Sequence, residues 1–153
     1  MGSEGPSAVT VHVTGFKKFH GVAENPTEKI VSNLKSFMEK RGLPKNLVLG
    51  SCTVLETAGE GALGTLHKVL ESAITTLPVN ELTKSLRKIG YDVMPSDDAG
   101  RFVCNYVYYH SLRFAEEHGI KSLFVHVPLF MTIDEEVQMH FVASLLELLA
   151  CTN

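Results

Sequence analysis

Cys104 and His126 have the chemical types and the sequence settings that covalent hydrolysis requires. Cys104 follows Ser96–Val103, a run that predicts a turn and then a helix, so the cysteine falls in the first turn or so of that helix. Backbone N–H groups and the helix dipole favour a thiolate there. His126 is the only polar residue of Leu123–Val127, near the end of a predicted strand, where α/β proteins place their sites. Such a pair could supply a nucleophile and a proton acceptor.

Both residues also have simpler interpretations. A free cysteine is most often a small buried hydrophobe, and a lone histidine on an apolar strand is most often a satisfied core residue. Cys52 and Cys151 lack a comparable setting and are predicted to be core and tail residues. Three cysteines are too few and too scattered for a disulfide scaffold, which favours the reducing cytosol as location.

Other residues suggest binding. Phe16 and Phe19 flank a glycine-rich turn and could form an apolar slot for a flat ring, although two core phenylalanines are an equal alternative. Gly59–Gly64 matches the G-x-G-x-x-G pattern of dinucleotide sites, but Glu81 falls in a helix rather than at a strand end. The remaining histidines show no metal-ligand spacing with cysteines, so no zinc site is expected.

Composition restricts the classes of protein that remain. The 153 residues are 44% hydrophobic and 20% charged, which is typical of one globular domain. A net charge of −3 does not indicate the basic surface that binds a nucleic-acid backbone. No apolar run approaches the length of a membrane span, and the first residues lack the pattern of a signal peptide.

The elements that must position these residues alternate between strand and helix. Strands are predicted at residues 9–13, 47–55, 91–95 and 123–127. Helices are predicted from Asn25-Pro26 to Gly42, over residues 62–74, and over residues 78–90. A further helix is predicted from the turn at residues 96–100 to about Glu117, and the last one over residues 133–149. This order predicts an α/β sandwich with a mainly parallel sheet, behind a flexible tail at residues 1–8. Two successive helices on either side of residues 74–78 are an allowed connection, but in an alternating chain they can also mean a missing β unit.

Three segments together resemble the pyroglutamyl peptidase I family of cysteine peptidases. They are Val13–Gly21 with Asn25-Pro26-Thr27, Ser96–Asn105, and Phe124–Pro128. The resemblance covers residues 9–73 and 77–150. It implies a single three-layer α/β domain over residues 9–150, of the phosphorylase/hydrolase type with a mixed sheet, and no cofactor.

The resemblance also implies roles for individual residues. Cys104 matches the nucleophile of the family and His126 its general base. The pocket that sandwiches the pyrrolidone ring is matched by Phe16, Phe19, Phe102 and Val103. The implied partners are peptides with an N-terminal pyroglutamate, and several family members form oligomers.

One departure from the family lies at residues 74–78. There the family carries several dozen further residues, which supply part of the sheet and the catalytic glutamate in a Glu-Arg-x-Ala-x-Asn-like motif. This chain has no counterpart of those residues, and it contains no Glu-Arg dipeptide. We therefore hypothesise a shortened form with part of the sheet missing. Glu56, Glu60, Asp97 and Asp98 are candidate substitutes for the absent acid.

Two functions follow. The first is a cytosolic cysteine peptidase that removes pyroglutamate from peptides. The alternative is a catalytically impaired, truncated isoform that binds pyroglutamyl ends or associates with itself or a full-length relative, since an exposed strand edge invites association. A nucleotide-binding domain at Gly59–Gly64 is the weakest of the hypotheses.

Overall fold

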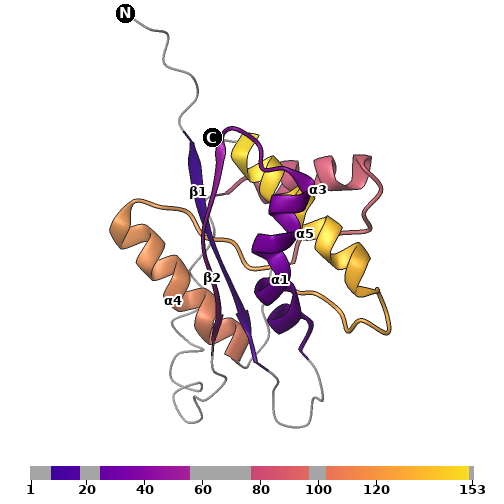
Figure 1. Cartoon of the computed structure of the whole chain (residues 1–153). Coiled ribbons are helices and arrows are strands. Elements are labelled where there is room, and N and C mark those ends of the chain that lie inside the picture. The colour runs from indigo at the N-terminus through magenta and orange to yellow at the C-terminus, as the bar shows by residue number, and fades with distance from the viewer. Residues whose placement is uncertain (1–7, 18–24, 56–76, 97–102, 152–153) are drawn as a thin grey trace, which may run out of the picture. The chain divides into compact units, whose positions relative to one another are not determined.

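The computed structural model describes residues 8–17, 25–55, 77–96 and 103–151 (Figure 1). These residues form, in chain order, β1 (Val9–Phe16), α1 (Pro26–Arg41), β2 (Leu47–Leu55), α3 (Val79–Lys88), α4 (Val103–His118) and α5 (Glu135–Cys151). Helices combined with a parallel sheet confirm the predicted α/β class. The helix expected over residues 62–74 lies outside the described residues.

The chain forms two compact units. The first comprises residues 1–57, 84–92 and 127–153, and so contains β1, α1, β2 and α5. The second comprises residues 58–83 and 93–126 and contains α4. None of the helices in the described ranges combines the length and apolar character that crossing a bilayer requires.

The sheet of the first unit is a parallel pair. β1 alternates as predicted, with its valines half-buried and Thr10, His12 and Thr14 exposed. Its register on β2 shifts between Val11 and Val13. Gly50 lies against the His12 ring at this shift, and an added Cβ would come 2.5 Å from Cε1. The strand therefore continues through Gly50 as a bulge rather than breaking there.

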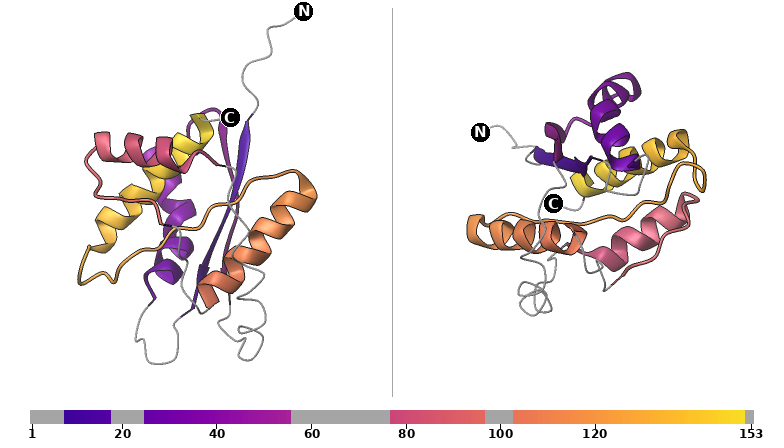
Figure 2. Two further views of the ribbon diagram at one scale, coloured as in Figure 1. Left: turned by 180° about the vertical axis from the view of Figure 1, so that it is seen from behind. Right: turned by 90° about the horizontal axis from the view of Figure 1, so that it is seen from below.

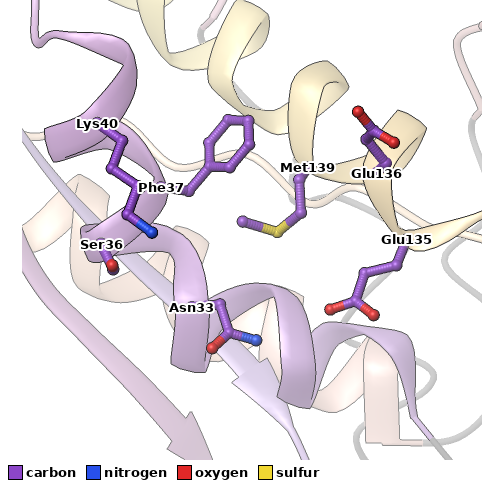
Figure 3. A pocket seen from close by; sticks show the side chains of 7 residues that line it. All are labelled: Asn33, Ser36, Phe37, Lys40, Glu135, Glu136 and Met139. Atoms are coloured by element: carbon purple, nitrogen blue, oxygen red, sulfur yellow. The ribbon is translucent and has the colours of Figure 1, made fainter.

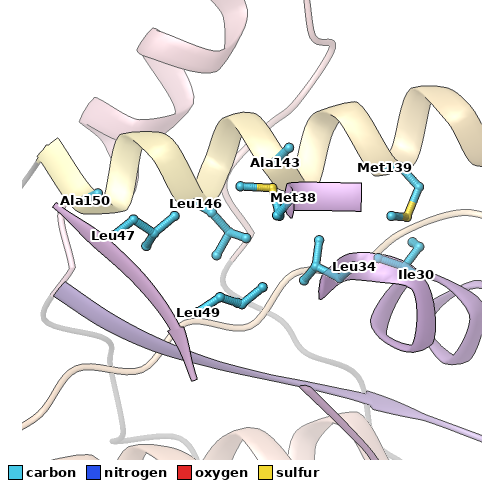
Figure 4. Close-up of a cluster of buried hydrophobic side chains, with 9 residues drawn as sticks. All are labelled: Ile30, Leu34, Met38, Leu47, Leu49, Met139, Ala143, Leu146 and Ala150. Carbon is cyan, nitrogen blue, oxygen red and sulfur yellow. The ribbon is translucent and has the colours of Figure 1, made fainter. Parts of the chain in front are cut away.

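α1 and α5 pack together and against this sheet (Figure 2). The helical face predicted for α1 is the buried one, since Ile30, Leu34 and Met38 are at most 3% exposed. Figure 4 shows side chains from α1, β2 and α5 meeting in one cluster. Its members are Ile30, Leu34, Met38, Leu47, Leu49, Met139, Ala143, Leu146 and Ala150.

Three helices end at the glycines that the sequence indicates. Gly42, Gly90 and Gly119 have φ of 94°, 104° and 66°, values that residues with a Cβ rarely adopt. After α3, the N–H of Tyr91 donates to the carbonyl of Leu86 and the N–H of Gly90 to that of Arg87. This double closure is the Schellman motif, and it satisfies carbonyls that the helix leaves unpaired.

Two predicted strands are wrong. Residues 91–95 and 123–127 have no strand structure, and the described residues contain no strand besides β1 and β2. The Tyr91 N–H is engaged in closing α3 instead of a ladder. The apolar run Leu123–Val127 has a high propensity for strand structure. A strand also needs a neighbouring strand for its backbone hydrogen bonds, and no described segment pairs with this run.

Candidate active site

Cys104 is the second residue of α4, and Val103 is the first. The prediction that this cysteine falls in the first turn of a helix is confirmed. The first N–H groups of a helix have no intrahelical acceptor, and the dipole gives that end partial positive charge. A thiol at this position is therefore in a setting that stabilises the thiolate, the form that attacks carbonyl carbons.

His126 lies in an irregular segment after α4, within the same unit as Cys104, and its side chain is exposed. Its ring meets that of Phe124 edge-on, with centroids 4.8 Å apart and an interplanar angle of 69°. Phe124 in turn packs on Tyr108 of α4 at 5.6 Å. An exposed imidazole that packs against another ring on one side can still exchange protons with bound molecules and with water.

Phe16 ends β1 in the first unit, and the start of α1 holds its backbone. Its N–H donates to the Thr27 hydroxyl at 2.9 Å. That hydroxyl donates to Oδ1 of Asn25, also at 2.9 Å, and the Asn25 amide donates to the Lys17 carbonyl at 3.2 Å. Asn25 is at the same time the N-cap of α1, as predicted, because Oδ1 accepts from the Thr27 N–H.

Asn25 and Thr27 thus have a role that sequence analysis missed. The sequence indicated a helix start at Asn25-Pro26-Thr27, but it gave no sign that the same side chains fix the backbone at Phe16. The nearness of Thr27 explains Gly15 as well, because a Cβ there would lie 2.6 Å from the Thr27 carbonyl oxygen. The segment that precedes the predicted ring slot is therefore anchored to α1.

Gln138 was also missed. This side chain is 3% exposed, and its amide nitrogen donates at 2.8 Å to the carbonyls of Pro128 and Ile133. Gln138 therefore fixes the backbone at Pro128 and Ile133, within the first unit. Glutamines are seldom buried so deeply, but a polar residue on an amphipathic helix gives no such signal in the sequence.

Several predicted residues lie outside the described ranges. They are the pocket residues Phe19 and Phe102, the candidate substitute acids Glu56, Glu60, Asp97 and Asp98, and the Gly59–Gly64 motif. Their roles stay predictions.

The other two cysteines belong to the first unit. Cys52 is half-buried next to the α1–α5 core cluster, and burial raises the pKa of its thiol although Lys35 partly opposes this. Its placement confirms the core role expected of it. Cys151 is the exposed last residue of α5. Within the described ranges, no three His, Cys, Asp or Glu side chains gather as a metal site would require.

A shallow groove lies elsewhere in the first unit, between α1 and α5 (Figure 3). Phe37 and Met139 form its apolar floor, and charged side chains stand around them. Its lining consists of Asn33, Ser36, Phe37, Lys40, Glu135, Glu136 and Met139. None of the residues predicted for catalysis or ring binding takes part in it.

Comparison with known proteins identifies relatives. The family model described as pyroglutamyl peptidase matches residues 65–144, which include both Cys104 and His126. Pyrrolidone-carboxylate peptidase from Thermococcus litoralis is 30% identical over 179 residues, covering 86% of this chain and 80% of that protein. The protein of the same name from Pseudomonas fluorescens is 41% identical over 54 residues, or 35% of this chain and 25% of its own length.

Solved structures show the same fold. Pyrrolidone carboxyl peptidase from Pyrococcus furiosus superposes with a TM-score of 0.73 at 21% identity, covering 94% of this chain and 99% of that one. The enzyme from Fervidobacterium islandicum gives a TM-score of 0.72 at 20% identity, covering 92% and 98%.

The alignment with the Thermococcus protein has a further feature. It spans 179 positions, whereas this chain has 153 residues. It therefore includes residues of the relative that have no counterpart here. This is the result expected if an internal segment is missing from the chain.

Proposed function

The chain belongs to the pyroglutamyl peptidase family, and from that premise we propose that it cleaves the amide bond after an N-terminal pyroglutamate in peptides. The observation that carries this proposal is the position of Cys104. The residue that matches the nucleophile of the family lies in the first turn of α4, where a thiolate is favoured. His126 follows in the same unit.

In the proposed reaction, the Cys104 sulfur attacks the pyroglutamyl carbonyl carbon while His126 accepts the thiol proton. The tetrahedral intermediate collapses when the C–N bond breaks, and the imidazolium returns the proton to the leaving amine. Water, deprotonated by His126, then attacks the thioester and releases pyroglutamate and the free thiol. Unpaired N–H groups in the first turn of α4 could stabilise the carbonyl oxygen in both steps.

We assign binding of the pyrrolidone ring to Phe16, Phe19, Phe102 and Val103. Phe16 lies at the end of β1, where Thr27 and Asn25 hold its backbone, and the residue is 6% exposed. Apolar side chains suit the CH₂ groups and the flat faces of this lactam ring, which lose contact with water when they are packed.

A non-catalytic binding role is the second candidate, and the missing segment favours it. The chain has no Glu-Arg dipeptide, so the glutamate that the family motif would place next to the histidine is absent. In serine proteases, replacing the residue that orients the histidine lowers kcat by about 10⁴. A thiolate is a better nucleophile than a hydroxyl, so a Cys–His pair can retain part of the activity.

We further infer a cytosolic location and association with a second copy or a full-length relative. The free thiols of Cys52 and Cys151 support the cytosolic location. The second rests on the sheet, which has only two strands among the described residues and so two edges there. Size-exclusion chromatography with light scattering tests this association, and a mass of 16.8 kDa at all concentrations would contradict self-association.

The proposed function is tested by hydrolysis of a fluorogenic pyroglutamyl amide, with the corresponding prolyl amide as control substrate. Cys104→Ala and His126→Ala are the informative variants, and Cys52→Ala is the matched cysteine control. We expect turnover in the wild type and in Cys52→Ala, and none in the other two. A folded wild-type protein without turnover that still binds pyroglutamyl peptides would establish the binding role instead.

A further inference from the structure

The groove between α1 and α5 lies within the first unit and has the length of a short peptide (Figure 3). The residues on its α1 side are spaced three and four apart and therefore share one helix face. They are Asn33, Ser36, Phe37 and Lys40. These positions span about 10 Å of the helix axis, which is about the length of an extended tripeptide. The volume of the groove, about 470 Å³, is typical of sites for small ligands.

The apolar floor of the groove is held in place. Phe37 and Met139 form it, and Met139 is 5% exposed. The ring of His140 meets that of Phe37 edge-on, with centroids 5.1 Å apart and an interplanar angle of 81°. Nδ1 of His140 accepts from Nη1 of Arg41 at 3.1 Å, because a guanidinium can only donate. The aromatic part of the floor is therefore preorganised for an apolar side chain.

Ion pairs join the two helices at both ends of the groove. Nζ of Lys29 lies 3.8 Å from Oε2 of Glu135. Arg41 donates from Nε to Oε1 of Glu147 at 2.9 Å and from Nη2 to Oε2 at 3.3 Å, a bidentate pair. Lys29 precedes the groove residues of α1 in the sequence, and Arg41 follows them. The distance between the walls of the groove is thus fixed on both sides of its floor.

The walls carry charges of opposite sign. α5 contributes the carboxylates of Glu135 and Glu136, and α1 contributes the ammonium of Lys40. Lys29 offsets one of the two negative charges, which leaves a net negative charge on the α5 wall. The side chain of Glu136 is 85% exposed, although its Oε1 lies 3.9 Å from Nε2 of His140. A molecule that complements this groove has an ammonium group, an apolar side chain and a carboxylate, in that order.

We propose that the groove binds short apolar peptides with free termini, the ammonium at Glu136 and the carboxylate at Lys40. A pyroglutamyl end has no such ammonium, because its nitrogen is part of the lactam. The peptide that the proposed reaction releases does have one. The groove therefore suits the product of that reaction rather than its substrate. This last link rests on the proposed function, whereas the binding itself does not.

Binding is measured on Cys104→Ala, so that the ligands are not cleaved. Methyl-labelled methionine gives an NMR signal for Met139, which Met139→Leu assigns, and the 90% exposed Met131 serves as the control signal. The ligands are trileucine, its N-acetyl form, its C-terminal amide and pyroglutamyl-dileucine. We expect trileucine to shift the Met139 signal to saturation. The three other ligands should bind about two- to fivefold more weakly, the range that an exposed ion pair contributes.

The same charges are then removed from the protein. Glu136→Gln should weaken binding of trileucine about two- to fivefold and leave the affinity for the N-acetyl form unchanged. Lys40→Gln should have the same effect on trileucine and none on the C-terminal amide. The matched controls are Glu39→Gln and Lys35→Gln, since both residues are exposed on α1 outside the groove. They should change no affinity, and circular dichroism establishes that each variant is folded.

Three results would overturn the proposal. The first is an N-acetyl or pyroglutamyl tripeptide that binds as tightly as the free one. The second is a Met139 signal that no ligand shifts, or a shift that Glu136→Gln and Lys40→Gln leave unchanged. The third is a Met139 signal that changes with protein concentration in the absence of ligand, which would show that a second copy of the chain occupies the groove. A wild type without turnover contradicts the proposed function alone, because none of these measurements depends on catalysis.

Discussion

Cys104 and Cys52 carry the same side chain, but their surroundings affect the ionisation of the thiol differently. Cys104 is the second residue of α4, where the helix dipole favours the thiolate. Cys52 is half-buried on β2, and burial raises the pKa of its thiol. A raised pKa leaves less thiolate at neutral pH, and the thiolate is the reactive form. The chain therefore contains a cysteine predicted to be the nucleophile and, for comparison, one whose burial disfavours the thiolate.

This contrast predicts the order of alkylation. At pH 7, iodoacetamide should modify Cys104 well before Cys52, and the rate at Cys104 should reach half its plateau below about pH 8.5, the value of an ordinary thiol. Peptide mass spectrometry measures each site separately, and the exposed Cys151 reports accessibility alone. A pH profile at Cys104 identical to that at Cys151 would show that the helix terminus does not activate the thiol.

At the scale of elements, the contact between β1 and α1 positions the segment that leads into the predicted ring pocket. Gly15 allows the approach, since any Cβ would lie 2.6 Å from the Thr27 carbonyl oxygen and 2.8 Å from Cγ2 of Val31. The carbonyl is part of the α1 backbone and cannot move without shifting the helix. The close packing in turn brings the Thr27 hydroxyl within 2.9 Å of the Phe16 N–H.

Gly15→Ala is therefore expected to destabilise the protein by about 1–3 kcal/mol, the usual cost of overpacking. Urea denaturation followed by circular dichroism measures the free energy of unfolding. Thr14→Ala, at the exposed neighbouring position of β1, is the control and should change it by less than about 0.5 kcal/mol. A Gly15→Ala protein as stable as wild type would mean that β1 and α1 are not so closely packed.

At the scale of the whole molecule, the chain combines the family fold with a shorter sequence. It superposes on pyrrolidone carboxyl peptidases with TM-scores of 0.72 to 0.73, yet its alignment with the Thermococcus relative is longer than the chain itself. The described sheet has two strands. The hypothesis of a missing segment would account both for the two strands among the described residues and for the absent Glu-Arg motif.

Restoring the segment tests this explanation. Inserting the unmatched residues of the Thermococcus protein between residues 74 and 78 should increase the rate of turnover. An orienting residue contributes a factor of about 10⁴ to kcat in serine proteases, and this factor is the upper limit of the increase that we expect. The same insertion with its glutamate replaced by glutamine is the control, and it should restore the fold without the rate. An inserted chain that is no more active than the native one would contradict the hypothesis.

Local patterns in the sequence determined much of this protein. Helix starts and stops at Asn25, Gly42, Gly90 and Gly119, the alternation of β1, and the place of Cys104 in a first helical turn all depend on residues a few positions apart. The order of these elements was enough to predict the α/β class. The three motifs were enough to indicate the family.

Only the tertiary structure decided features that depend on distant residues. Whether Leu123–Val127 forms a strand depends on a neighbour to bond with, which no local pattern supplies. The hydrogen bonds from Phe16 to Thr27 and from Gln138 to Pro128 join residues ten or more positions apart. The packing of Phe124 between Tyr108 and His126 depends equally on how α4 meets the segment after it. Propensity acts along the chain, whereas strand pairing and side-chain packing depend on the residues that folding brings side by side.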